Sequence, residues 1–459
     1  MAFEAKAPHT EWEEFLRGHP ETRFIDTFMI GASSQVYGKR EPAKDLDRVF
    51  SSGVTFSACA ALLDVHGHGH NAAGLGSTDG DPDAVGYPIP GTLVPVPWAS
   101  SPTAQCLLDM RDAKTNEPLW FDPRKILSDV VAGLHAQGLY PVVACELEFY
   151  LIDSERTEKG GIRPSRLKRT AAPPHSPQNL GLDAVEDYAD FVSAIEHAAA
   201  LQNIPATTAV AEYGLGQFEI NLQHGNDPVL AADQAVLLKR LIRGVARSQG
   251  HDATFMGKPY MDQPGSGLHV HVSLCDKAGR NLFGSKEGEP LFYHAIAGMQ
   301  AMLAESLALF APNIASFRRF KPHNFVPVNA HWGHNNRSVA LRVPLGEGQA
   351  KRIENRASSA DASPHLAVAA ILSALHYGIQ HRLTPTPPVD LKRADEMAPP
   401  PGATKMAKHF LAALDDLAKA KKLAGFIPAR FLKAYCEMKI GEYNELFAEP
   451  SEREFNYYL

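Results

Sequence analysis

Seven acidic and imidazole side chains stand out because they occur in short segments that otherwise read as buried β-strands. Carboxylates gathered in one core repel each other by about 4 kcal/mol per pair at 4 Å and an effective dielectric constant near 20. Only cations make such a cluster tolerable. The seven residues are Glu146, Glu148, Glu212, Glu219, His269, His271 and Glu354.

Spacing predicts that pairs of these side chains share one face of a strand. Glu146 and Glu148 lie two residues apart in the apolar segment 141–152, and His269 and His271 repeat this spacing in a second apolar segment. Alternate residues of a strand point to the same side of a sheet. A concave sheet could therefore direct both pairs into one pocket.

Glu212 and Glu219 do not have this spacing. They are seven residues apart and would point to opposite faces of a straight strand. Gly214 and Gly216 lie between them and supply a bend that could turn both carboxylates inward.

Carboxylates with imidazole and no cysteine ligand favour Mg²⁺ or Mn²⁺ over zinc, and the number of carboxylates favours two ions. Metal-binding carboxylates also serve hydrolases, so nearby arginines must decide the reaction class. Arginine forks bind carboxylates and phosphates, and two metals beside several arginines suit phosphoryl transfer. The candidate arginines are Arg319, Arg337, Arg342 and Arg356.

The composition limits the classes of function. The chain has 459 residues, 44% hydrophobic and 21% charged, and a net charge of -7, which provides no general basic field for nucleic acid. No apolar run approaches the length of a membrane span, and the first 20 residues do not resemble a signal peptide. We expect a cytoplasmic protein with reduced cysteines, no membrane contact and no nucleic-acid partner.

The pattern along the chain predicts an α+β protein with two domains, 1–112 and 113–459. We expect strands at 23–30 and 58–65 in the first domain, followed by a long Gly/Asp/Pro-rich loop or sheet edge over 72–98. In the second domain, strands alternate with helices, including one helix over 184–202. The proline-rich segment 384–402 is expected to form an exposed loop or flap.

Five motifs in this order resemble those of the glutamine synthetase family: ELEFYL, EYGLGQFE, GSGLHVHVSL, NRSVALRVP and RIENRASSADASPHLAVAAIL. The resemblance implies a small β-grasp-like N-terminal domain and a catalytic domain with a curved barrel-like sheet flanked by helices. It also implies a homo-oligomeric ring, a hexamer or a stacked double hexamer, with active sites between neighbouring subunits.

The resemblance also assigns roles to residues. One metal site matches Glu148, Glu212 and Glu219, and the other matches Glu146, His269 and Glu354. The groups that grip glutamate match Gly265, Arg319 and Arg356; those that face the phosphoryl group match Arg337 and Arg342; those that contact ATP match His271, Ser273, Arg337 and Arg352. The implied reaction is phosphorylation of the glutamate γ-carboxylate by ATP, followed by attack of an amine to form an amide.

The chain departs from the family pattern at Phe325, which stands where glutamine-forming members carry a glutamate. An ammonium ion must be held by carboxylates and deprotonated, whereas phenyl favours a buried alkyl or aryl group by about 2 kcal/mol. We therefore expect a larger primary amine, either a polyamine or a bulky monoamine. Alternatives are a true glutamine synthetase, in which Phe325 merely packs, and an inactive ligand-binding ring protein.

Asp64 aligns with the family's other acid at the amine site and could bind or deprotonate the attacking amine. His66, His68 and His70 follow at alternate positions. On a strand they would share one face like a metal site; in a loop they would line the amine entrance or be solvated. The segment 385–401 contains no tyrosine, so regulation by nucleotidylation is not expected.

Overall fold

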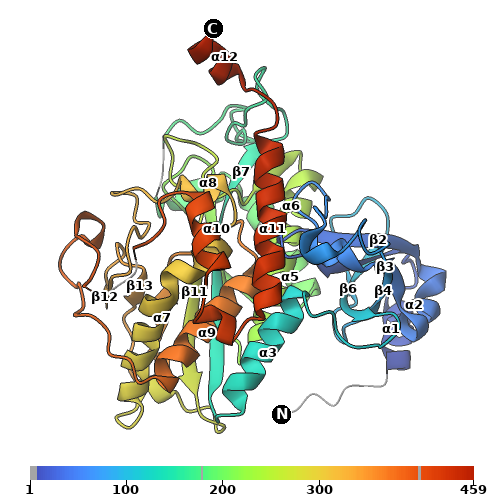
Figure 1. Cartoon of the computed structure of the whole chain (residues 1–459). Coiled ribbons are helices and arrows are strands. Elements are labelled where there is room, and N and C mark those ends of the chain that lie inside the picture. Colours follow the sequence, from blue (N-terminus) through green and yellow to red (C-terminus); the bar gives the residue numbers. More distant parts are fainter. Residues whose placement is uncertain (1–7, 177–178, 402–404) are drawn as a thin grey trace.

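Two β-sheets organise the chain in this computed structural model, which describes residues 8–176, 179–401 and 405–459 (Figure 1). The smaller sheet belongs to the N-terminal region, drawn in blue. The larger sheet lies behind a layer of helices that includes α3, α7 and α9.

The N-terminal sheet is six-stranded, with the order β2-β1-β6-β4-β3 and β5 paired with β6. Its central pair, β1 and β6, is parallel, and the other pairs are antiparallel. The predicted β-grasp-like character and the boundary at residue 112 stay predictions. The elements are α1 (Pro8–Gly18), β1 (Phe24–Ile30), β2 (Val36–Pro42), α2 (Leu46–Ser52), β3 (Val54–Ser57), β4 (Asp83–Pro88), β5 (Val94–Pro95) and β6 (Thr103–Asp112).

The predicted strand over 58–65 is wrong. The strand β3 ends at Ser57, and Ala58–Leu62 forms a 3-10 helix. Three of these five residues are alanines, which are depleted in strands. Conversely, the glycine- and proline-rich segment 72–98, expected to be a loop or sheet edge, contributes β4 and β5.

The larger sheet is eight-stranded, with the order β12-β13-β14-β11-β7-β9-β8 and β10 paired with β7. All its pairs are antiparallel except β12 with β13. The strands are β7 (Tyr140–Asp153), β8 (Ala206–Ala211), β9 (Gln217–Leu222), β10 (His251–Thr254), β11 (Leu268–Cys275), β12 (Trp332–His334), β13 (Leu341–Val343) and β14 (Ile353–Asn355).

Helices cover one face of this sheet. The helices α3, α6, α7 and α9 pack against one another, and α3 and α6 also contact β7. Alternation along β7 explains the polarity of the other face, because Cys145, Leu147 and Phe149 are fully buried whereas Glu146 and Glu148 are only partly buried. The helices are α3 (Pro123–His135), α4 (Leu182–Glu186), α5 (Ala189–Leu201), α6 (Pro228–Ser248), α7 (Glu289–Phe310), α8 (Ile314–Phe317), α9 (Pro364–Gln380), α10 (Phe410–Ala418), α11 (Ala429–Leu446) and α12 (Glu452–Tyr458).

Two other expectations compare directly with the structure. The single helix predicted over 184–202 is divided into α4 and α5, with non-helical backbone at Tyr188. The predicted loop over 384–402 is irregular apart from a 3-10 turn at Ala394–Glu396, and its last residue lies outside the described residues. Within the described part of the chain, no helix has both the length and the apolar character needed to cross a bilayer.

Candidate active site

In the larger sheet, the register of the strands places acidic and imidazole side chains directly opposite one another on neighbouring strands. Glu146 of β7 is paired with His269 of β11, and Glu148 of β7 is paired with Glu219 of β9. Directly opposed residues on one face lie about 5 Å apart at Cβ. The two-residue spacing therefore does what the sequence predicted, and acidic and imidazole side chains from three strands come together.

Glu146 lies at the centre of two groups that could each hold a cation. Its Oε1 lies 2.6 Å from Nε2 of His271, and its Oε2 lies 3.3 Å from Nδ1 of His269. Potential ligand atoms converge in Glu146, His271 and Glu354, and in Glu146, Glu219 and His269. His271, which the resemblance assigns to ATP, thus lies close enough to share a cation with Glu146.

The bend between Glu212 and Glu219 is a tight turn. Gly216 has a φ of +73°, and a side chain at Gly214 would lie 2.2 Å from the hydroxyl of Tyr150, so glycine is required at both positions. Both glutamates consequently line the same cavity, as predicted.

Negative charge in the cavity exceeds what its surroundings neutralise. Burial, together with the neighbouring charges of Glu146 and Glu148, raises the pKa of Glu219 to about 9. Burial and Glu148 together raise the pKa of Glu212 to about 7. Without a cation these two carboxyls therefore retain protons, and a divalent ion would displace them.

Glu354 differs from these two carboxyls because arginines enclose it. Burial opposes its ionisation, yet Arg356 and His269 lower its pKa to about 2. Arg342 donates from Nη1 to Oε2 at 2.8 Å, and Arg356 donates to Oε1. Arg342 is therefore paired with a candidate metal ligand.

Several guanidinium nitrogens have no partner among the described residues although they are buried. They are Nε and Nη1 of Arg319, Nε of Arg342 and Nε of Arg356. Arg319 is only 2% exposed, and burial lowers its pKa. Buried donors of this kind are normally satisfied, so these arginines are suited to an anionic ligand.

All these groups border one cavity of about 650 Å³. Gly265 forms part of its wall, where a side chain would lie 2.6 Å from Cγ of Arg319. The sequence-predicted residues that line it are Glu146, Glu148, Glu212, Glu219, Gly265, His269, Arg319, Phe325, Arg337, Arg342, Glu354 and Arg356.

Phe325 lies at the rim of the cavity and is 44% exposed. Its backbone has a φ of +52°, which is unusual for an aromatic residue. Its carbonyl accepts a hydrogen bond from Nη2 of Arg356 at 3.4 Å, and its ring lies 5.0 Å from the guanidinium carbon of Arg393. Phe325 and Arg337 also border an outer cavity of about 520 Å³.

Comparisons with known proteins agree with this geometry. The sequence profile of the glutamine synthetase catalytic domain matches residues 121–458. The chain belongs to the glutamine synthetase family. It is therefore an enzyme of the ATP-dependent ligases that form a carbon–nitrogen bond, and members of this family use divalent metals.

Curated relatives of this glutamine synthetase family chain include amine ligases. It is 39% identical over 375 residues to γ-glutamylputrescine synthetase PuuA of Escherichia coli strain K12, covering 81% of this chain and 79% of the relative. It is 32% identical over 457 residues to glutamate–isopropylamine ligase of a Pseudomonas species, covering 96% of each chain. Among solved structures, a GmaS/ADP complex superimposes with a TM-score of 0.82 at 23% identity over 99% of each chain, which shows the fold.

The remaining residues that the family resemblance assigns to ATP lie beside this cavity. Arg352 donates from Nε to Nδ1 of His271 at 3.2 Å. Ser273 is buried on β11, two residues beyond His271 and so on the same face. Neither His271 nor Ser273 nor Arg352 borders the cavity itself.

Asp64 lies away from this cavity in the N-terminal region. Its carboxylate is fully buried and accepts hydrogen bonds from the backbone N–H groups of His66 and His68 at 2.8 and 2.9 Å. Nε2 of His70 lies 2.7 Å from its other oxygen. The three histidines lie on a turn, not on a strand, which removes the shared strand face.

Arg393 is a residue of the site that the sequence analysis missed. It lies in the proline-rich loop, where nothing in the local sequence distinguishes it from a solvated arginine. Asp395 accepts hydrogen bonds from it at 3.1 and 2.7 Å and from the backbone N–H of His323 at 2.7 Å. The loop thus holds Arg393 against Phe325 by an ion pair.

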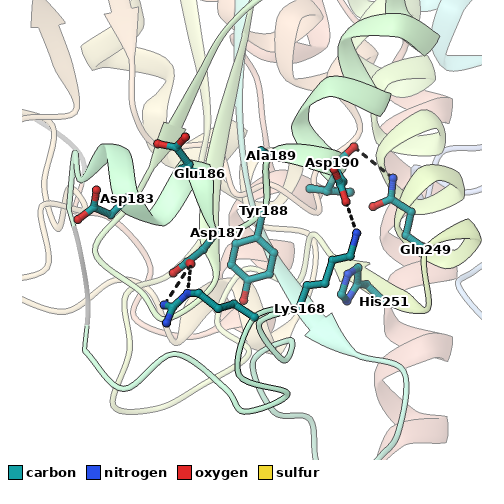
Figure 2. Close-up of a pocket in the computed structure, with 11 residues that line it drawn as sticks. Lys168, Asp183, Glu186, Asp187, Tyr188, Ala189, Asp190, Gln249 and His251 are labelled. Carbon is teal, nitrogen blue, oxygen red and sulfur yellow. Dashed lines mark hydrogen bonds and ion pairs between the residues drawn. The ribbon is translucent and has the colours of Figure 1, made fainter.

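A second cavity, of about 1020 Å³, lies near α4, α5 and the segment around Lys168 (Figure 2). Its two basic side chains pair with acids: Lys168 with Asp190 at 2.5 Å and Arg169 with Asp187 at 3.3 Å. It is larger than the acidic cavity but contains none of the family's motif residues.

Proposed function

We propose that this protein phosphorylates the γ-carboxylate of L-glutamate with ATP and condenses the product with a primary amine larger than ammonium. The observation that carries the proposal is Phe325, an aromatic side chain at the rim of a cavity rich in glutamates and arginines. The remainder of the site supports the phosphorylation, and Phe325 supports the choice of amine.

Two divalent ions, Mg²⁺ or Mn²⁺, would be held by the carboxylates. In the proposed arrangement Glu148, Glu212 and Glu219 hold one ion, and Glu146, His269 and Glu354 hold the other. The raised pKa values of Glu212 and Glu219 support this, because they reflect carboxylates placed together without enough positive charge. Oxygen-rich ligand sets suit these hard cations. Bound ions would neutralise the phosphates of ATP.

The arginines would bind the two anionic substrates. We assign the glutamate substrate to Arg319, Arg356 and Gly265, because Arg319 has buried donors without partners beside the cavity wall. Arg337 and Arg342 would face the transferred phosphoryl group. His271, Ser273 and Arg352, with Arg337, would contact ATP.

The reaction follows from this placement. An oxygen of the γ-carboxylate attacks the γ-phosphorus of ATP, and the bond from this phosphorus to the β-phosphate oxygen breaks to release ADP. The neutral amine then attacks the carbonyl carbon of the γ-glutamyl phosphate. The carbon–oxygen bond to phosphate breaks, inorganic phosphate leaves, and the amine nitrogen loses a proton.

The amine would approach past Phe325. The phenyl ring provides apolar contact for an alkyl or aryl group and no charge to hold ammonium. The outer cavity beyond it is bordered by Arg337, Lys392, Arg393 and one acid, Asp390. Within one chain this balance of charge favours an uncharged tail over a second ammonium group.

The relatives support an amine as co-substrate because two of them are named for putrescine and for isopropylamine. We also infer a homo-oligomeric ring with active sites between subunits. Asp64 would reach a cavity only from a neighbouring copy. There it would bind the amine through the carboxylate that His70 orients.

The test is phosphate release with ATP, Mg²⁺, glutamate and single amines. The panel contains ammonium, isopropylamine, spermidine, and the matched pair butylamine and putrescine, which differ by one terminal amino group. We expect kcat/KM for at least one organic amine to exceed that for ammonium by more than about tenfold. Strong turnover with ammonium alone would identify a true glutamine synthetase. If the protein binds ATP but releases no phosphate with any of the amines, it is an inactive binding protein.

A further inference from the structure

The turn that follows Asp64 is joined to helix α11 through Glu445, which lies 377 residues after His68 in the chain. Nδ1 of His68 lies 3.0 Å from both carboxylate oxygens of Glu445. Nδ1 of His70 lies 3.8 Å from Oε1 of the same carboxylate. Two imidazole rings therefore approach one carboxylate, and none of the three side chains borders the acidic cavity.

The ring of His70 is oriented by a buried acid. Asp64 has no exposed side-chain surface, and the hydrogen bonds it accepts from the turn lower its pKa although burial opposes this. An ionised carboxylate can only accept, so Nε2 of His70 carries the proton of this 2.7 Å hydrogen bond. Nδ1 is then the ring nitrogen of His70 that faces the carboxylate of Glu445.

The helix is shaped to receive this ring. Gly441 lies in the interior of α11, where glycine costs about 1 kcal/mol relative to alanine. A side chain there would lie 2.3 Å from Cγ of His70. A second contact is the hydrogen bond from the backbone N–H of Ala73 to Glu437 at 2.7 Å. Gly441 in α11 leaves room for the ring of His70, and the hydrogen bond to Glu437 holds the segment after the turn against the helix.

We propose that Nδ1 of His68, Nδ1 of His70 and the carboxylate of Glu445 form a binding site for a transition-metal ion of the zinc class. Two imidazoles and one carboxylate form a ligand set that zinc uses, with a fourth position left for water. Asp64 would act on the far nitrogen of His70, as carboxylates commonly do behind metal-bound histidines.

This site differs chemically from the acidic cavity. The cavity offers many carboxylates and suits Mg²⁺ or Mn²⁺, whereas imidazole-rich sites prefer zinc, cobalt or nickel. Zinc bound here would connect the turn after Asp64 to α11. The segment around Asp64 would then be held in place by metal as well as by hydrogen bonds.

The experiment measures metal binding to the purified full-length protein in excess Mg²⁺, which occupies the acidic cavity. Zn²⁺ stoichiometry is determined by competition with a chromogenic chelator, and Co²⁺ is added separately to record visible absorption. The variants are His68→Ala and Glu445→Gln. The matched control is His66→Ala, which changes an exposed histidine of the same turn outside the proposed ligands.

We expect wild type and His66→Ala to bind one more equivalent of Zn²⁺ than His68→Ala and Glu445→Gln. The Co²⁺ absorption assigned to this site should disappear in the same two variants. Zn²⁺ should also raise the midpoint of thermal unfolding of wild type and His66→Ala more than that of His68→Ala. Equal stoichiometry in all four folded proteins would overturn the proposal and leave only histidine–carboxylate ion pairs.

Discussion

The two cavities of this protein differ more in charge balance than in size. The larger, about 1020 Å³, pairs its lysine and arginine with aspartates across its opening. The smaller, about 650 Å³, collects glutamates whose pKa values are raised and arginines with buried nitrogens that lack partners among the described residues. The smaller cavity is therefore the better candidate for binding an ionic substrate, because several of its buried charges are not neutralised by neighbouring side chains of the described residues.

The physical reason is the cost of burial. A buried carboxylate or guanidinium without a partner loses hydration that nothing replaces. Such buried charges are stabilised when a bound ligand or metal ion supplies the missing partner. Charges that are paired and exposed, as in the larger cavity, contribute little to stability and require no ligand.

The largest expected effect comes from removing a central carboxylate. Glu146→Gln should lower kcat/KM for glutamate phosphorylation by more than about 100-fold, because both groups of potential metal ligands include Glu146. Asp190→Asn in the larger cavity removes a carboxylate that is paired but exposed, and should change activity less than twofold. Phosphate release measured on both variants would contradict the comparison if the two losses were equal.

The acidic cavity should also differ from the larger one in how its metal affinity depends on pH. Because the pKa of Glu219 is raised from 4.5 to about 9, the metal-free folded state holds this proton and loses stability as pH rises from 4.5 to 9. Mn²⁺ must displace it, so affinity should rise by up to about tenfold per pH unit within this range. Calorimetric titration at several pH values measures this.

Glu219→Gln is the matching control for the pH series. It should bind Mn²⁺ more weakly and show a shallower rise of affinity with pH. In the larger cavity the shift runs the other way, because the pKa of Asp190 is lowered by Lys168. An unchanged pH dependence in Glu219→Gln would show that another group holds the proton.

Replacing Phe325 at the rim of the smaller cavity should change which amine the enzyme prefers. Phe325→Glu introduces a carboxylate where an ammonium ion would be held, and removes apolar surface from the amine's path. We expect kcat/KM for ammonium to rise and that for isopropylamine to fall, each by about tenfold. Phe325→Leu keeps the surface apolar and should retain the preference for the organic amine.

The smallest expected effect concerns Arg393. Arg393→Gln removes a cation held over the ring of Phe325, a contact worth about 0.5 to 1 kcal/mol at exposed sites. The KM of the amine should rise about two- to fivefold while the KM of glutamate is unchanged. Arg169→Gln breaks an exposed pair in the larger cavity and should alter neither constant.

Local patterns predicted the parts of the fold that depend on alternation and capping. Asp122 followed by Pro123 is a local pattern typical of a helix start, and in α3 the side chain of Asp122 accepts a hydrogen bond from the backbone N–H of Arg124. The alanine-rich segment after Ser57 was mispredicted because short apolar runs fit a strand or a helix equally well. The break at Tyr188 has no local signal in a helix-forming sequence.

Some residues of the candidate site were likewise predicted from the sequence and others were not. The motif glutamates and arginines were found from residue type, spacing and family resemblance, and most of them line the acidic cavity. The position of Arg393 against Phe325 was not predicted, because it depends on Asp395 and on a loop without regular structure. The enclosure of Asp64 was not predicted either, because its hydrogen bonds come from a turn for which the sequence left strand and loop both open.

The sequence by itself determined the class of chemistry, because side chains two residues apart on a strand must share a face wherever the strand lies. Only the tertiary structure decided which charges are neutralised. It paired Glu354 with two arginines, left Glu212 and Glu219 without an arginine partner among the described residues, and brought Glu445 to the histidine turn. Neutralisation depends on distances between segments far apart in the chain, and local sequence does not encode those distances.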